Sequence, residues 1–284
     1  MGDIDLIVKP EDFDRASKLL LEICEYLGEN RRHIELRRNG IVVELHRSFS
    51  TFNNAAKNQL LDGLIFKAIN HAEWVQLEGF SFPMLPPEIN GLVLLEHINV
   101  HMESGLGLRQ IIDWMLFADR HLENPVWEQN FLPTVRQLGL EALAVSVTRM
   151  CQIYLGLRQD ITWCHGADDT LCGDLMSHTL QQGNFGRKLP RGYNRTVNLL
   201  STAKKGPALL RSLQRRGCIN WPLLKKLPWL RPFAWLYQLC RYIRRGLQLN
   251  HPIRHLRSAL KKEHQQDILF DRLGITRMKE EHET

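Results

Sequence analysis

Two aspartates lie two residues apart in the first stretch of the chain. The sequence begins MGDIDLIVKPEDFDRA, and Asp3 and Asp5 alternate with apolar residues in a segment typical of a strand. Acidic residues are uncommon in strands, so these charges indicate either an exposed face or a ligand.

Paired carboxylates on a strand, joined by a third from a neighbouring strand, can hold two Mg²⁺ ions. Such ions lie about 3.5 to 4 Å apart and promote in-line attack on phosphate. The alternative is that Asp3 and Asp5 only make the open face of a terminal strand soluble, because a D-x-D motif alone also occurs by accident.

A second segment supplies the third carboxylate. In HIELRRNGIVVELH, two alternating runs flank Asn39-Gly40, which is the strongest short signal for a hairpin. Because side chains alternate along a strand, Glu44 and His46 share one face of the second hairpin strand. If the strands join one sheet, Asp3, Asp5, Glu44 and His46 lie on the same polar face. His46 could contact a metal-bound ligand, help to move a proton, or only neighbour the carboxylates.

The elements that position these groups follow from periodicity. The opening of the chain reads strand, helix, strand, strand. The helix starts near Pro10, carries an apolar stripe of Phe13, Ala16, Leu20, Ile23 and Leu27, and ends at Gly28. The apolar face of the sheet that receives this stripe is predicted to consist of Ile4, Leu6, Val8, Ile34, Leu36, Ile41, Val43 and Leu45.

The remainder of the chain is predicted to be mostly helical. Helical spacing begins near residue 55, WVQLEGFSFPML reads as a short extended pair, and four helical segments follow at 88–103, 108–122, 127–138 and 140–155. We therefore expect an α+β fold, with a core at residues 1–85, a helical region at 86–215 and a basic tail at 216–284 rich in Trp and Arg.

The tail carries a heptad-like stripe that could lie on an anionic membrane or on nucleic acid, although packing on the second region is the simpler interpretation. The stripe consists of Trp229, Phe233, Leu236, Cys240, Ile243 and Leu247, with Arg231, Arg241, Arg244 and Arg245 largely elsewhere.

Composition excludes little. The net charge of +6 is compatible with anionic partners but is too small to choose among them. The six cysteines are scattered, without the spacing of a zinc site, and no apolar run approaches the roughly 20 residues that span a bilayer. With no cleavable signal before the first strand, we expect a cytoplasmic protein with free thiols.

Three blocks of the sequence carry a resemblance. MGDIDLIV, HIELRRNGIVVELH and GLGLRQIIDW resemble, in order and spacing over roughly residues 1–125, the uncharacterised nucleotidyltransferase family, a branch of the polymerase-beta-like superfamily. The resemblance implies a small mixed sheet flanked by helices and nucleotidyl transfer from a nucleoside triphosphate, with Mg²⁺ held by Asp3, Asp5 and Glu44. The acceptor stays unknown.

The chain departs from this superfamily at its start. There, a Gly-Ser turn at a helix start precedes the D-x-D strand and binds the triphosphate through backbone amides. Here only Met1 and Gly2 precede Asp3, and Gly2 alone does not replace that helix. Either the gene product starts upstream, or the chain lacks a complete nucleotide site and is inactive or depends on a partner.

Other residues are candidates for positions near the nucleotide or substrate. Gly2 directly precedes Asp3, and His33 and His46 bracket the hairpin, with His46 on the face of Glu44. Arg109 could approach phosphate, although Arg109 and Asp113 are spaced as a surface ion pair on a helix. The pair His97 and His101 lies one helical turn apart, but packing or a substrate-proximal role is favoured over zinc because the H-E-x-x-H glutamate is missing.

The leading hypothesis is a nucleotidyltransferase enzyme, that is, a transferase of phosphorus-containing groups. One alternative is an inactive binding or regulatory protein that keeps the fold. The other is a peripheral membrane or nucleic-acid binding protein that uses its basic tail.

Overall fold

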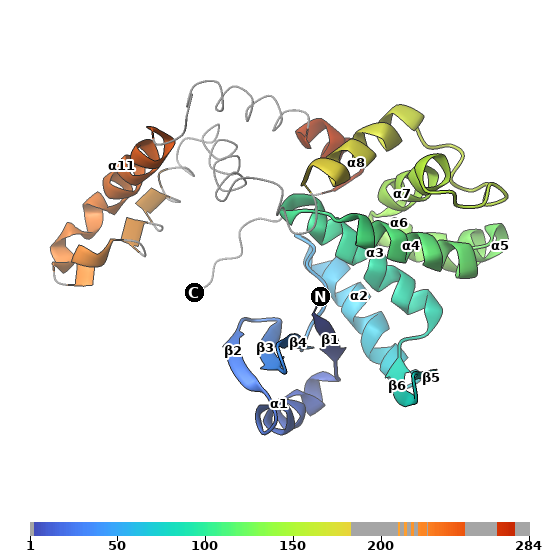
Figure 1. Ribbon diagram of the computed structural model, residues 1–284, viewed down its shortest axis with the longest axis horizontal. Coiled ribbons are helices and arrows are strands. Elements are labelled where there is room, and N and C mark those ends of the chain that lie inside the picture. The colour runs from blue at the N-terminus through green and yellow to red at the C-terminus, as the bar shows by residue number, and fades with distance from the viewer. Residues whose placement is uncertain are drawn as a thin grey trace. The chain divides into compact units, whose positions relative to one another are not determined.

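The computed structural model describes residues 3–182, 210, 213–214, 217–218, 221–225, 227–247 and 266–275, so Gly2 lies outside the described residues. The chain divides into two compact units (Figure 1). The first contains residues 1–185 and 270–284, and the second contains residues 186–269. The predicted boundaries at 85 and 215 stay predictions.

The first unit opens with a mixed sheet of four strands in the order β1-β4-β3-β2. These strands are β1 (Ile4–Ile7), β2 (Glu25–Glu29), β3 (His33–Arg38) and β4 (Ile41–His46). β1 pairs with β4 in parallel, whereas β3 pairs with both β4 and β2 in antiparallel fashion. With the helices that follow, this confirms the predicted α+β fold.

The predicted hairpin is confirmed at Asn39-Gly40. Both residues have positive φ, 51° for Asn39 and 80° for Gly40, which a two-residue hairpin turn of the primed type requires. Arg38 and Ile41 are therefore directly paired, and the register of β3 against β4 is fixed from this turn to His33 and His46.

The prediction of one helix reaching from Pro10 to Leu27 was wrong. A 3₁₀ turn, η1 (Pro10–Asp12), leads into α1 (Phe13–Leu21), and the chain then enters β2. Two backbone amides after the helix, those of Ile23 and Cys24, donate to the Leu20 carbonyl and close it. The next residues pair with the open edge of β3, with a bulge at Leu27, so ladder hydrogen bonds outweigh the helical spacing of the side chains.

One face of the sheet and α1 enclose a small core. Its buried members are Phe13, Ile34, Leu36, Val43 and Leu45, with Val8, Ala16, Leu20 and Cys24 partly buried against them. The predicted apolar face is thus confirmed for β3 and β4. Ile4 and Leu6 share this face, since they pair with Val43 and Leu45, but on this edge strand they are 46% and 37% exposed rather than buried.

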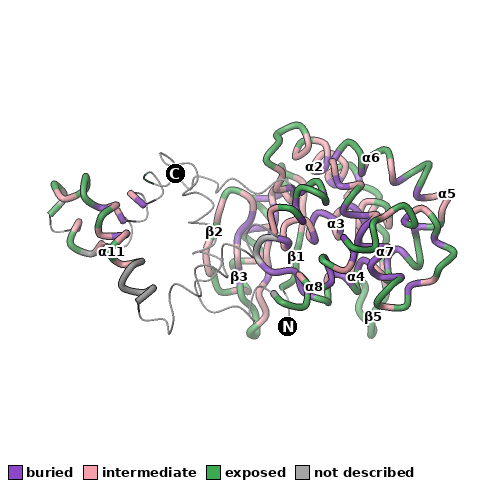
Figure 2. The backbone as a smooth tube through the Cα atoms, turned by 90° about the horizontal axis from the view of Figure 1, so that it is seen from above, coloured by how far each residue is buried: buried purple, intermediate pink, exposed green. Residues whose placement is uncertain are grey.

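The remaining described residues of the first unit form helices and one hairpin, with the segments that connect them, as expected. The hairpin is formed by β5 (Glu73–Leu77) and β6 (Phe80–Met84). The helices are α2 (Ala55–Ile69), α3 (Pro87–Ser104), α4 (Leu108–His121), α5 (Asn124–Val126), the π-helical turn η2 (Trp127–Phe131), α6 (Leu132–Leu138), α7 (Glu141–Tyr154) and α8 (Asp169–Gln182). Buried segments run through α3, α4 and α7 (Figure 2). Inside this core the indole Nε1 of Trp114 donates to Thr148 Oγ1 at 2.9 Å.

The described part of the second unit contains η4 (Pro222–Lys225), η5 (Pro228–Phe233) and α11 (Ala234–Leu247). Trp229, Phe233 and Leu236 of the predicted stripe are exposed, and the side chains of Arg244, Arg245, Ile243 and Leu247 lie outside the described residues. Binding of a membrane or nucleic acid by this tail stays a prediction. Among the helices that the structure describes, none has the length and apolarity to cross a bilayer.

A buried hydrogen-bond network ties the end of β4 to α2 and α3. The backbone N–H groups of Phe49 and Ser50 each donate to Asp62 Oδ1 at 3.0 Å. Thr51 donates to Glu96 Oε1 through its backbone N–H at 3.1 Å and through its hydroxyl at 2.7 Å. Glu96 is fully buried, and this burial raises the pKa of its carboxyl although these hydrogen bonds oppose the shift. The segment after β4 is therefore held against the helices by two acidic side chains.

We expect Glu96→Ala to lower the free energy of unfolding by about 1 to 3 kcal/mol, because it leaves the partly buried donors of Thr51 and Asn99 without their acceptor. Urea denaturation followed by circular dichroism measures this change. Glu88→Ala, at an exposed position in the first turn of the same helix, should cost well under about 1 kcal/mol. Equal losses for the two variants would contradict the assigned role of Glu96.

The raised pKa of Glu96 also predicts a pH effect on stability. The folded state binds this proton more tightly than the unfolded state, whose carboxyl titrates near 4.5. The stability contributed by the protonated group is therefore fully present below pH 4.5 and is lost as pH rises through the higher folded pKa. Urea denaturation of Glu96→Gln between pH 4 and 8 should show a smaller fall of stability with pH than the native chain shows. A parallel pair of curves would contradict the prediction.

Candidate active site

The strand pairing brings a carboxylate and a histidine of β4 beside the polar residues of its two neighbours. Asp5 pairs with Glu44 across the parallel ladder, and His33 pairs with His46 across the antiparallel one. Paired residues point to the same face of a sheet, and these alternate with the core residues that contact α1. The polar face of the sheet thus brings together Asp5, His33, Glu44 and His46.

His46 lies between the two carboxylates. Its Nε2 is 2.9 Å from Asp5 Oδ1 and 3.3 Å from Glu44 Oε2. An ionised carboxylate only accepts hydrogen bonds, so Nε2–H donates to both. Burial by itself would lower the pKa of His46, but the hydrogen bonds to Asp5 and Glu44 outweigh it and raise the pKa to about 9.

The two carboxylates respond to the same contact. Burial would raise the pKa of Asp5, but the hydrogen bond and the charge of His46 leave it below its ordinary value. For Glu44 the hydrogen bond to His46 is the largest effect and lowers the pKa. Both groups are therefore ionised at neutral pH, and an imidazolium neutralises part of their charge.

His33 is oriented by a turn that precedes its strand. The Asn30 Oδ1 accepts from the backbone N–H groups of Arg32 at 2.8 Å and His33 at 3.1 Å. This leaves Asn30 Nδ2, which is a donor only, at 3.1 Å from His33 Nε2. The Nε2 of His33 also lies 3.4 Å from Glu35 Oε1 and 3.6 Å from Glu44 Oε2, so this nitrogen accepts from Asn30 in one tautomer and donates to Glu35 in the other.

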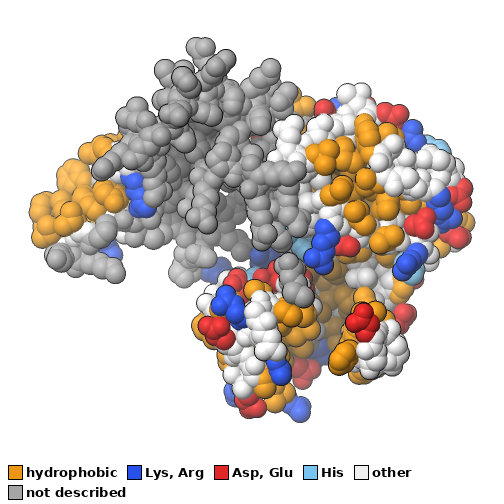
Figure 3. Space-filling view, viewed as in Figure 1, with side chains coloured by type: hydrophobic (Ala, Val, Ile, Leu, Met, Phe, Trp, Pro, Cys, Tyr) orange, Lys and Arg blue, Asp and Glu red, His pale blue; other side chains and the backbone are white. Residues whose placement is uncertain are grey.

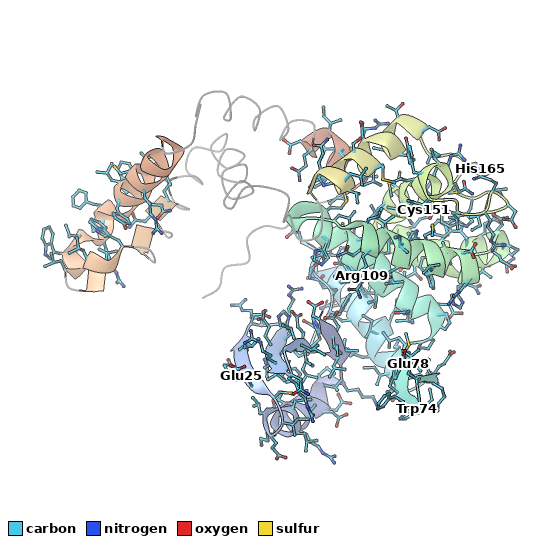
Figure 4. The ribbon with its side chains drawn as sticks, in the orientation of Figure 1. Glu25, Trp74, Glu78, Arg109, Cys151 and His165 are labelled. Atoms are coloured by element: carbon cyan, nitrogen blue, oxygen red, sulfur yellow. The ribbon has the colours of Figure 1, made fainter. Side chains whose placement is uncertain are left out.

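The other predicted residues lie elsewhere. Asp3 precedes β1, outside its paired residues, and is exposed. Arg109 lies on α4 (Figure 4) and forms a 3.9 Å ion pair with Asp113, with both side chains largely exposed. This is the surface pair that the spacing predicted. Among the described residues, neither Asp3 nor Arg109 forms a hydrogen bond or ion pair with Glu44.

The histidine pair of α3 interacts electrostatically with the same carboxylates. The rings of His97 and His101 have centroids 4.5 Å apart. Burial, and then the charge of His97, lower the pKa of His101 to about 4, while Asp5 and Glu44 act in the opposite direction. The histidines of α3 therefore lie close enough to Asp5 and Glu44 for the charges of these groups to affect one another's pKa.

Sequence reasoning missed two groups that shape this site, Asn30 and Glu35. Both could have been found from local spacing. Asparagine just before a strand commonly accepts hydrogen bonds from the backbone amides two and three residues ahead, as Asn30 does. Glu35 follows His33 by two residues on the same strand, so its side chain lies on the same polar face. Glu96 was missed as well, since its partner Thr51 is 45 residues away in the sequence.

Three side chains of this sheet lie close enough together to bind one cation. The His33, Glu44 and His46 ligand atoms all lie within 4.8 Å of one another.

The six cysteines are free thiols, and burial raises the pKa of the Cys151, Cys164 and Cys172 thiols above their ordinary value. On the face visible in Figure 3, acidic and basic side chains are interspersed over the first unit.

The fold and the site define an α+β protein whose mixed sheet presents two carboxylates and two histidines on one polar face. Comparison with protein families then identifies the chain. The model described as "Uncharacterised nucleotidyltransferase" matches residues 1–156, more than half of the 284 residues, and the chain belongs to this family. The resemblance in the three blocks is confirmed, and it extends to the end of α7. No curated protein and no solved structure matches the chain.

The contact between Asp5 and His46 predicts a measurable titration. In chelator-treated protein, NMR should show His46 titrating near pH 9, and Asp5→Asn should move its pKa downward toward 6.5. Because the folded pKa is the higher one, the stability given by charged His46 is fully present below pH 6.5 and is lost as pH rises through about 9. Asp14→Asn, an exposed change on α1, serves as the control, and a His46 pKa near 6.5 in the native chain would contradict the assignment.

Proposed function

We propose that this protein transfers a nucleoside monophosphate from a nucleoside triphosphate to an acceptor. An acceptor oxygen attacks the α-phosphorus, the bond from that phosphorus to the bridging oxygen breaks, and pyrophosphate leaves with its electron pair. The acceptor loses its proton to solvent or to a nearby base. Family membership supports the reaction class, and the acceptor can be a small molecule, a protein side chain or an RNA end.

The observation that carries this proposal is the register of β1 on β4. It places Asp5 beside Glu44, with both carboxylates ionised on one partly buried face. Oxygen ligands of this kind fit Mg²⁺, and Asp3 is the third carboxylate that we propose for the set. Bound magnesium would polarise the phosphoryl oxygens and neutralise charge on the leaving pyrophosphate.

The residues of the chain would then have distinct tasks. Asp5 and Glu44 bind and orient, since their strands hold them in register. His46 holds both carboxylates in place through Nε2. Its positive charge also reduces the repulsion that these carboxylates would exert on a bound phosphate. His101, neutral at pH 7, can exchange hydrogen bonds with a substrate at the side of the site formed by α3.

One observation favours the non-catalytic alternative. His46 already satisfies both carboxylates with a proton, as expected for a structural polar cluster in a protein that keeps the fold and binds or regulates without transfer. The two functions differ in whether Mg²⁺ replaces these contacts when a nucleotide binds.

Calorimetric titration of nucleoside triphosphates with Mg²⁺ tests the proposal. We expect the native chain to bind and Asp3→Asn/Asp5→Asn to bind at least about tenfold more weakly, because two of three carboxylates are neutralised. Asp12→Asn/Asp14→Asn is the matched control, since it removes the same charge at exposed positions. Absence of binding by the native chain, or equal binding by the first double variant, would show that the carboxylates do not form this site.

A further inference from the structure

Three ligand atoms on two neighbouring strands converge with donor chemistry that Mg²⁺ does not favour. We propose that His33, Glu44 and His46 bind a single late first-row transition-metal ion, with Zn²⁺ as the representative. The site shares Glu44 with the proposed magnesium site, but its existence does not depend on nucleotidyl transfer.

The distances match those between ligands of one small ion. With nitrogen and oxygen ligands each about 2.0 to 2.2 Å from zinc, neighbouring ligand atoms lie about 3.0 to 3.4 Å apart for bond angles from about 90° to the tetrahedral value. Glu44 Oε2 lies 3.3 Å from His46 Nε2 and 3.6 Å from His33 Nε2. These two separations are within a few tenths of an ångström of ligand spacing, and all three ligand atoms lie within 4.8 Å of one another.

The protonation pattern supplies the donors. In the tautomer in which Asn30 Nδ2 donates to it, His33 Nε2 carries the lone pair that a metal ion needs. The position between His46 Nε2 and Glu44 Oε2 is held by a proton, which goes to solvent when the ion binds. Asn30 Nδ2 gives up its contact with His33 Nε2 in the same step.

The scaffold favours a preformed site. His33 and His46 are 8% and 6% exposed, directly paired, and part of two strands whose register the Asn39-Gly40 turn fixes. Two imidazole nitrogens with one carboxylate select zinc, cobalt, nickel or iron over magnesium, because nitrogen donors bind late first-row ions more strongly. Glu35 and Asp5 are next to the set and add negative charge.

The strongest competing position is the His97 and His101 pair. These residues lie one turn apart on α3 with ring centroids 4.5 Å apart, a spacing that also binds zinc in helices. This pair offers two nitrogens, and it also interacts electrostatically with Asp5 and Glu44. The experiment must therefore separate two positions within the same protein.

Metal-free full-length protein, prepared with a chelator and without nucleotide, is titrated with Zn²⁺ against a competing indicator. His33→Asn and His46→Asn should each weaken binding at least tenfold, whereas the exposed control His71→Asn should stay within twofold. Millimolar Mg²⁺ should not displace the ion. Unchanged affinity in the first two variants, or loss of binding in His97→Asn/His101→Asn alone, would overturn the proposal.

A second variant keeps the test valid if an asparagine change unfolds the sheet. His33→Cys places a thiolate at the same strand position, and Co²⁺ should then give a sulfur-to-cobalt charge-transfer band in the near ultraviolet, absent from the native protein and from His71→Cys. Absence of the band in folded, Co²⁺-loaded His33→Cys would exclude His33 as a ligand. Because no nucleotide is present, failure of the proposed nucleotidyl transfer would leave these results unchanged.

Discussion

The register of the mixed sheet is the constraint on which the site depends. Side chains alternate along a strand, so a slip of one residue between β1 and β4 would turn Asp5 toward α1 and remove it from Glu44. A slip of β3 against β4 is opposed by burial, because it would turn Leu36 or Leu45 out of the core. The apolar core under the sheet therefore fixes Glu44 and His46 relative to His33, whereas the position of Asp5 depends on the parallel ladder between β1 and β4.

The polar face carries more negative charge than a partly buried surface normally tolerates. Asp5 and Glu44 are adjacent and both ionised, which is unfavourable unless a cation lies between them. In the protein alone, the imidazolium of His46 is that cation. A metal ion that binds here takes the place of the proton on His46, so binding of the ion is coupled to release of that proton.

Much of this could be predicted from the sequence, for reasons that are local. Alternation in HIELRRNGIVVELH and the Asn39-Gly40 turn determine the hairpin, and the alternation places Glu44 with His46. β2 could not be predicted, since its residues continue the helical spacing and only the open edge of β3 makes them a strand. The exposure of Ile4 and Leu6 could not be predicted either, because it depends on which strand occupies the edge of the sheet.

Glu44 belongs to both proposed cation sites, and its geometry allows this. Its Oε2 faces His33 and His46, while Asp5 lies beside it on the parallel strand. A carboxylate has two oxygens and can bind two cations at once, one through each. An ion held by the histidines would replace the proton on His46 and so free Asp5 from its hydrogen bond, leaving Asp5 and the second oxygen of Glu44 for magnesium. The two proposals therefore describe compatible occupants of one face rather than competitors for it.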